Sequence, residues 1–325
     1  YIPHIDGLRG LAVLLVLLFH LDIAVFKGGF VGVDVFFVIS GFLITDMIVK
    51  EIETTGKFSF ANFYARRIKR IFPAFFAMLV FATLGAILFL GAKDYAAFFK
   101  ALRFASASIS NVFFSRDVDY FANDNTHSAL LHTWSLGVEE QFYIGLPLLL
   151  ILTHKFLGIQ RAGVILGVLL LSSFALSEYL LHTDAKQAFY LIQSRAWELA
   201  LGGIVALKSI PPLTTKKSAE LYGAAGILAI VAAALLFDKT NFPGLKALLP
   251  CLGAALFLYA GKSSPAIIHQ WMSHKLIVFV GLISYSLYLF HFPIIAIYKS
   301  YFGDDLNAPV QISMALASFL LAYLS

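Results

Sequence analysis

The fold is decided by one apolar stretch near the N-terminus, Arg9-Gly10-Leu11-Ala12-Val13-Leu14-Leu15-Val16-Leu17-Leu18-Phe19-His20, which begins with a cation and ends with an imidazole. In a helix that rises about 1.5 Å per residue, Arg9 and His20 lie roughly 16 Å apart and about three full turns apart, so both project from the same face. If Arg9 lies at one interface of a hydrocarbon core about 30 Å thick, His20 lies near its middle. An ionisable residue at that depth indicates a functional site, and the structural alternative is a hydrogen bond to a neighbouring helix.

The composition is typical of a membrane protein and not of a soluble domain. The 325 residues are 60% hydrophobic and only 13% charged, whereas soluble domains are about 45–50% apolar and about 25% charged. The net charge of +5 suits cytoplasmic loops rich in Lys and Arg and is too small and too scattered to argue for a nucleic-acid partner. The single cysteine, Cys251, lies in an apolar run, so we expect neither a disulfide nor a cysteine-based metal site.

Apolar runs of spanning length predict an all-α, polytopic membrane protein of about ten transmembrane helices, in one domain that covers residues 1–325. The runs fall near residues 11–26, 32–49, 72–91, 134–153, 162–181, 193–207, 219–237, 244–260, 276–298 and 308–325. The stretch 95–115 is more polar, and its apolar residues recur at roughly helical spacing, so we expect an interfacial or re-entrant helix there. The chain begins without Met and stops inside an apolar run, so we expect both ends to be cropped.

Loop charges predict the orientation of the chain in the membrane. The densest basic cluster lies between the second and third runs and consists of Lys50, Lys57, Arg66, Arg67, Lys69 and Arg70. The positive-inside rule places this loop and the N-terminus in the cytoplasm. Beyond residue 150 the rule is only weakly obeyed, because several basic residues then lie outside: Lys186, Arg195, Lys239, Lys246 and Lys299. If 95–115 spans, everything after it inverts.

The basic cluster is also a candidate phosphate site. If the segment is helical, Arg67 and Arg70 are three residues apart and share a face, with Arg66 and Lys69 adjoining. Guanidinium groups match phosphate oxygens in a bidentate manner, so the cluster could hold a phosphorylated ligand. The alternative is a topology signal that also attracts anionic lipid.

Several other ionisable residues lie in or beside the apolar runs. Asp34 is expected near the outer end of its helix, either in a capping or helix-packing role or in the site. Glu139 and Glu140 occupy the first turns of an apolar helix, which is costly unless they face a wet cavity or a partner. A structural ion pair with an arginine is the alternative for one of them.

Two later positions are open to a structural reading. Arg195 and Glu198 are three apart and can pair with each other. His291 lies among aromatic residues, where a hydrogen-bonded core histidine is the alternative to a site residue. No second His or Cys lies near His20 at ligand spacing, so we expect no metal.

Stretches in order along the whole chain resemble the acyltransferase-3 family, the membrane O-acyltransferases of surface polysaccharides. The most specific is Leu131-His132-Thr133-Trp134-Ser135-Leu136-Gly137-Val138-Glu139-Glu140-Gln141-Phe142-Tyr143. The others are 6–20, 29–42, 67–73, 195–199 and 284–293.

The resemblance implies a reaction at the bacterial inner membrane, with the N-terminus cytoplasmic. An acyl group, usually acetyl from cytoplasmic acetyl-CoA, is transferred to a hydroxyl of an extracytoplasmic glycan such as O-antigen or peptidoglycan. The resemblance also implies a periplasmic SGNH domain, fused after Ser325 or separate, as in many members of the family.

The resemblance also implies roles for the residues above. The basic cluster of Arg67, Arg70, Arg66 and Lys69 is expected to hold the CoA phosphates. Arg9 is expected to guide the pantetheine arm or to stabilise the oxyanion of the thioester. His20 is expected to be the general base on the acceptor or to carry the acyl group.

On the acceptor side, Glu139 is expected to be a third catalytic residue that, like Asp34 and His291, orients either His20 or the acceptor sugar. The expected substrate-binding residues are Asp34, Glu140, His291 and Arg195. Two other classes of function remain open from the residues alone. The protein could be a transporter or flippase for a glycan or an acyl carrier, with the buried charges as coupling residues, or an inactive scaffold for a partner enzyme.

Overall fold

A computed structural model describes residues 2–117, 128–208, 210–262 and 266–325 of the chain. In these residues the regular structure is entirely helical, which confirms the all-α fold class. The longer helices are α1 (Pro3–His20), α2 (Gly32–Thr55), α3 (Phe60–Phe89), α6 (Thr133–Leu157), α7 (Ala162–Thr183), α10 (Lys216–Leu236), α11 (Gly244–Gly261), α14 (Ser284–Phe302) and α15 (Ala308–Leu324). The shorter helices are α4 (Ala92–Ser106), α5 (Ser110–Asp117), α8 (Ala185–Tyr190), α9 (Ile192–Ala206), α12 (Ile267–Met272) and α13 (Lys275–Leu282).

All ten expected apolar runs lie on helices, but the helices differ in length. Seven are long and apolar enough to cross a membrane, and the pair α13–α14, bent by 65° at its break, makes an eighth if counted as one span. The remaining two runs form α9, with 15 residues, and α15, with 17. α9 is less apolar because it carries Arg195 and Glu198, and it packs inside the bundle against α2 and α7. The chain is a multi-pass membrane protein.

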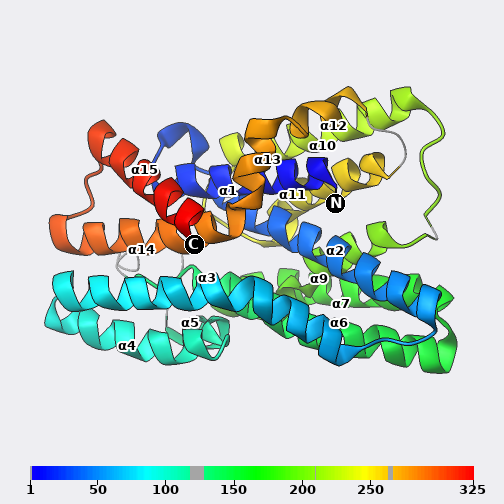
Figure 1. Cartoon of the computed structure of the whole chain (residues 1–325), viewed down its shortest axis with the longest axis horizontal. Coiled ribbons are helices and arrows are strands. Elements are labelled where there is room, and N and C mark those ends of the chain that lie inside the picture. Colours follow the sequence, from blue (N-terminus) through cyan, green and yellow to red (C-terminus); the bar gives the residue numbers. More distant parts are fainter. Residues whose placement is uncertain (1, 118–127, 209, 263–265) are drawn as a thin grey trace.

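The stretch 95–115 forms two helices and no span. α4 and α5 are joined by a turn in which Ser108 has a positive φ of 56°. Neither helix is long enough to count as a span, and α4 packs beside α3 (Figure 1). This agrees with the expected non-spanning segment.

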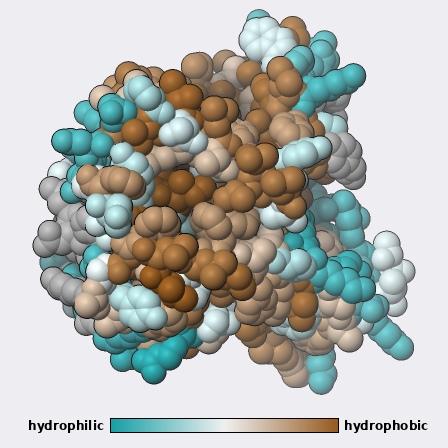
Figure 2. Space-filling view, turned by 60° about the vertical axis from the view of Figure 1, so that its left-hand side comes forward, coloured by the Kyte–Doolittle hydropathy of each residue, from teal (hydrophilic) through white to brown (hydrophobic). Residues whose placement is uncertain are grey.

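The surface carries the apolar side chains that a bilayer requires. Figure 2 shows apolar residues across most of one face, with hydrophilic residues mainly toward its margins. On α3, Val80, Leu84 and Leu88 recur every four residues and are 57–71% exposed. Helical residues four apart share a face, so α3 presents a continuous apolar stripe to lipid.

α1 lies at the centre of the packing that forms the site. It contacts α2, α13 and α14, and α14 runs along α3 (Figure 1). The face of α1 toward these helices is closed, with Leu8, Val13 and Val16 at 0% exposure. The polar residues at its two ends, Arg9 and His20, are therefore held by packing on a rigid helix.

Two glycines let α2 and α9 approach closely. A Cβ on Gly41 would lie 1.8 Å from the carbonyl oxygen of Leu199, and one on Gly202 would lie 1.9 Å from that of Val38. Both distances are far inside van der Waals contact with backbone, so any larger residue must push the helices apart. This contact brings the buried charges of α2 and α9 together.

The break before α14 sets the direction of its polar side chains. Tyr285, Tyr288 and His291 follow one another at intervals of three residues, which places them along one face of the helix. Tyr285 and Tyr288 line the same cavity as Arg9, and His291 contacts His20, so these side chains face α1.

Candidate active site

A first cavity, here called the Arg9 cavity, opens among α1, α2, α3, α6 and α14. Its volume is about 810 Å³ including its open mouth. It is lined by Arg9, Val33, Phe36, Phe37, Ile39, Ser40, Leu43, Ile44, Arg67, Arg70, Ile71, Ser135, Leu136, Glu139, Tyr143, Ser284, Tyr285 and Tyr288. The lining combines an apolar interior with three arginines and one carboxylate, which suits a ligand with an aliphatic arm and an anionic end.

Glu139 is held in this cavity by two hydroxyl groups. Ser40 Oγ donates to Glu139 Oε1 at 2.8 Å, and the hydroxyl of Tyr143, one turn further along α6, donates to Oε2 at 3.1 Å. Across the cavity, Arg9 pairs with Asp6 at 3.3 Å. Glu139 was expected to orient His20 or the acceptor sugar, but it lines the Arg9 cavity, whereas His291 contacts His20.

The basic cluster is divided between two faces of α3. Arg67 and Arg70 line the Arg9 cavity, as their spacing on one helix face allows. Arg66 points elsewhere, and its guanidinium lies 3.4 Å from Glu51. Lys69 is exposed and does not line the cavity. Only the first pair is therefore placed to meet a ligand in that cavity.

At the other end of α1, His20 and His291 form a hydrogen-bonded pair. His20 Nδ1 lies 3.0 Å from His291 Nε2, and His291 Nδ1 lies 3.0 Å from the carbonyl oxygen of Leu287. The carbonyl can only accept, so a neutral His291 keeps its proton on Nδ1 and accepts at Nε2. His20 then donates from Nδ1, and its Nε2 carries the lone pair of a base.

A second cavity, here called the His20 cavity, lies at this end of α1. It has a volume of about 500 Å³ and is lined by Phe19, His20, Asp22, Leu131, Lys239, Phe292, Ile295, Ala296 and Lys299. The sequence did not single out Asp22, Lys239 or Lys299 as site residues. The one available indication was that Lys239 and Lys299 break the positive-inside pattern.

A partition of hydrogen-bonded groups separates the two cavities. Tyr288 lines the Arg9 cavity, and its hydroxyl donates to the carbonyl oxygen of His132 at 3.0 Å. The same hydroxyl lies 2.7 Å from Ser135 Oγ. On its other side, the Tyr288 ring is 5.6 Å from that of His291, which pairs with His20. The rings of Tyr288, His132 and His291 thus lie between the Arg9 cavity and His20.

Arg195 lies in a separate, closed cluster. Its guanidinium contacts Asp34 at 2.9 Å and Glu198 at 2.8 Å, and all three side chains are at most 1% exposed. The guanidinium carbon lies 5.5–5.7 Å from the ring centroids of Phe37, Trp134, Phe189 and Phe242.

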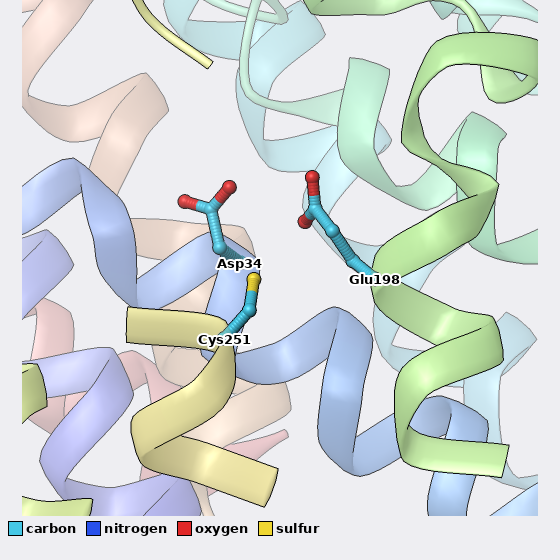
Figure 3. Close-up of side chains that lie close together, drawn as sticks. All are labelled: Asp34, Glu198 and Cys251. Atoms are coloured by element: carbon cyan, nitrogen blue, oxygen red, sulfur yellow. The ribbon is translucent and has the colours of Figure 1, made fainter. Parts of the chain in front are cut away.

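Asp34, Glu198 and Cys251 also point toward one another (Figure 3) and bring three possible ligand atoms within 4.8 Å. The proximity of Cys251 to Asp34 and Glu198 could not be predicted from the sequence, because the three residues are far apart along the chain. The carboxylates already face the guanidinium of Arg195, which supplies the positive charge that a metal would bring. The set therefore fits an ion-pair cluster better than a metal site.

The remaining expected substrate-binding residues are placed as follows. Neither Asp34 nor Arg195 lines either cavity. Glu140 is half-buried on α6 and lines neither cavity. His291 is fully buried and contacts His20. Ser40 and Tyr288 were missed because their partners lie 99 and 153 residues away, whereas Tyr143 could have been found as the i+4 neighbour of Glu139.

The chain is similar to known proteins over nearly its whole length. The acyltransferase domain family matches residues 2–325. A Staphylococcus aureus (strain COL) protein provisionally named an O-acetyltransferase is 34% identical over 96% of this chain and 53% of its own length. The peptidoglycan O-acetyltransferase OatA of Listeria monocytogenes is 32% identical over 91% of this chain and 50% of its length. The O-acetyltransferase OatA of Staphylococcus aureus (strain NCTC 8325) is 32% identical over 100% of this chain and 56% of its length.

The chain thus spans about half the length of the curated relatives it matches. No solved structure matches it. Since the family match covers the chain from residue 2 to residue 325, the chain belongs to the acyltransferase-3 family.

Proposed function

We propose that this domain transfers an acyl group, acetyl from acetyl-CoA, through the membrane to a hydroxyl of a glycan on the other side. The observation that carries the proposal is the pair of cavities at the two ends of α1, one lined by arginines and the other by His20. Peptidoglycan is the acceptor we propose to test first, because one relative is named for it.

The orientation follows from the charges of α3. Arg67 and Arg70 of α3 line the same cavity as Arg9, and clustered basic residues of this kind favour the cytoplasmic side. The Arg9 cavity then opens toward the cytoplasm and the His20 cavity away from it. In this proposed orientation the N-terminus is inside, at the cytoplasmic membrane.

The Arg9 cavity fits an acyl-CoA donor. Arg67 and Arg70, at its lining, are placed to bind phosphate oxygens. The apolar lining beyond them, including Leu43 and Ile44, fits a narrow aliphatic arm. The donor supplies a thioester whose carbonyl carbon accepts the attacking hydroxyl.

The separation of Arg9 and His20 supports one of the two roles considered for Arg9. The residues lie roughly 16 Å apart along α1 and line different cavities. One reacting carbonyl cannot contact both, so Arg9 guides the arm of the donor and does not stabilise an oxyanion formed at His20. The acyl end reaches His20 when Tyr288 moves aside.

His20 then acts as the general base. Its Nε2 takes the proton of the acceptor hydroxyl, whose oxygen attacks the thioester carbonyl. The carbon–sulfur bond breaks, and the leaving thiolate recovers the proton from Nε2, so that His20 ends as it began. His291 holds the His20 ring through the 3.0 Å hydrogen bond and fixes which nitrogen is the base.

The proposal is tested by reconstituting the protein in vesicles with acetyl-CoA labelled in its acetyl group on one side and peptidoglycan strands on the other. Wild type is expected to produce labelled glycan, and Arg66→Gln is expected to match it because Arg66 faces Glu51. A wild type that yields no labelled glycan contradicts the proposal. Movement of unmodified glycan across the membrane would identify a transporter instead.

A further inference from the structure

The wall of the His20 cavity contains charged groups that the proposed chemistry does not use. Its inner part is apolar, with Leu131, Ile295 and Ala296. Two ammonium groups and one carboxylate complete it, from Lys239, Lys299 and Asp22. An acceptor that reaches His20 must pass or contact these charges.

One of the two lysines is already neutralised. Lys299 is 6% exposed, and its Nζ donates to Asp22 Oδ2. Asp22 lies in the turn that follows α1, where it has a positive φ of 57°. Gln311 of α15 holds this turn through a 2.9 Å hydrogen bond to the carbonyl oxygen of Leu21. The pair is therefore a fixed part of the wall.

Lys239 is the cation that stays available. It is exposed, and it forms no ion pair within the described residues. The neighbouring carboxylate of Asp238 forms an ion pair with Lys246, whose Nζ lies 2.7 Å from Asp238 Oδ1. Hydrogen bonds from Lys246 and Thr240 hold the pKa of Asp238 well below its ordinary value, so that carboxylate stays ionised and paired.

Lys239 also lies close to the reacting position. Its Nζ is 5.6 Å from the centroid of the Phe19 ring, and that ring is 5.0 Å from the ring of His20. An anionic group bound at Lys239 would thus belong to the same sugar or to its neighbour, with the acceptor hydroxyl at His20. Among the described residues that line the cavity there is one uncompensated positive charge, which a single carboxylate balances and a phosphate dianion would exceed.

We propose that the acceptor glycan carries a carboxylate close to the acylated hydroxyl, and that Lys239 binds this carboxylate and thereby selects the substrate. The inference rests on the proposed function, because it assumes that the acceptor enters the His20 cavity. It adds the charge of the acceptor, which the family match does not give.

The test measures binding of glycan strands in the absence of any acyl donor. The protein is placed in nanodiscs of phosphatidylcholine, which carry no net charge. The probes are peptidoglycan strands with free carboxylates and the same strands after conversion of the carboxylates to primary amides. Wild type is expected to bind the free-acid strands at least about fivefold more tightly, and the difference is expected to shrink as salt is added.

Variants assign the preference to one residue. Lys239→Gln is expected to bind both forms with the affinity that wild type has for the amide form, while Lys239→Arg keeps the preference. Lys27→Gln is the matched control, because Lys27 is an exposed lysine at the same end of α1 that does not line the cavity.

Equal binding of the two forms by wild type, or a preference that survives in Lys239→Gln, would overturn the inference. Transfer of labelled acetyl in the vesicle assay would leave the proposed function standing in either case. A protein that acetylates the strands but binds neither form measurably would also contradict the inference.

Discussion

Two groups of buried charges in this bundle contain the same residue types but differ in their surroundings. Around Arg195, the guanidinium, Asp34 and Glu198 are at most 1% exposed and are enclosed by aromatic rings. Around Arg9, the guanidinium and Glu139 line a cavity of about 810 Å³. An intramembrane charge is costly in either place. Whether a buried charge can bind a ligand or instead holds helices together therefore depends on the presence of a cavity beside it, and not on the type of residue.

The charges that line the Arg9 cavity are called here the open group, and those around Arg195 the closed group. The largest effect is expected at His20, the residue proposed to act on the acyl donor that the open group binds. His20→Ala is expected to lower acyl transfer by about 10²–10⁴-fold, the usual contribution of a general base, or about 3 to 5 kcal/mol of activation free energy. Folding should be kept, because His20 lies on a cavity wall. Label transfer and the thermal midpoint of the purified variant measure the two quantities.

The control for this variant is His182→Ala, whose side chain is 75% exposed and far from either cavity lining. It should leave transfer unchanged. If His20→Ala transfers acetyl at the wild-type rate, His20 has no role in the mechanism. Label bound stably to wild type in the absence of acceptor, and missing in His20→Ala, would favour a covalent acyl-histidine over direct transfer.

Substitutions in the closed group should change the stability of the protein and not the rate of acyl transfer. Arg195→Met removes the charge that compensates Asp34 and Glu198, and we expect it to lower the free energy of unfolding by about 3–5 kcal/mol. The triple variant Asp34→Asn, Arg195→Met, Glu198→Gln leaves no charge in this cluster and should recover much of this loss. Denaturant titration in detergent measures both.

The molecules of the triple variant that fold should transfer acetyl at a rate near that of wild type, once the rate is normalised to folded protein. A triple variant that folds normally but has lost transfer would mean that the Arg195 cluster takes part in substrate binding, as its sequence context suggested. This result would break the distinction between the two groups.

A smaller effect is expected at Arg67 and Arg70, the two arginines of the open group that are proposed to bind the donor. Arg67→Gln and Arg70→Gln each remove a guanidinium from the cavity lining, and we expect the KM for acetyl-CoA to rise about tenfold with kcat little changed. The effect at Arg70 should be the weaker, because Arg70 is exposed and solvent screens its charge. Initial rates at varied acetyl-CoA concentrations measure it.

Arg66→Gln is the matched control, one residue away and directed to Glu51. A rise in KM at Arg66 equal to that at Arg67 would mean that the cluster acts through its general charge. Arg67 and Arg70 would then be topology signals and not a phosphate site.

The sequence predicted what depends on local spacing. The apolar runs located the helices, and the interval of three residues put Arg67 and Arg70 on one face of α3. It could not predict contacts between distant segments. The pairing of His291 with His20 joins residues 271 apart, and that of Arg195 with Asp34 joins residues 161 apart. Helix periodicity gives the face of one helix but not the helix that covers it.

The smallest effect is expected at the partition, where Tyr288 separates the open Arg9 group from His20. Tyr288→Phe keeps the ring between the cavities but removes the hydroxyl that bonds to the His132 carbonyl and to Ser135. A hydrogen bond of this kind is worth about 1 kcal/mol, so the barrier to moving the ring should fall by about that amount. If the ring is a gate, hydrolysis of acetyl-CoA without acceptor should rise about fivefold, because water gains access to the thioester.

Tyr285→Phe, which removes a hydroxyl bonded to the Ile71 carbonyl on the same face of α14, is the control. Equal hydrolysis by wild type and Tyr288→Phe would show that the hydroxyl does not hold the partition closed, and the passage between the cavities would then have to open elsewhere.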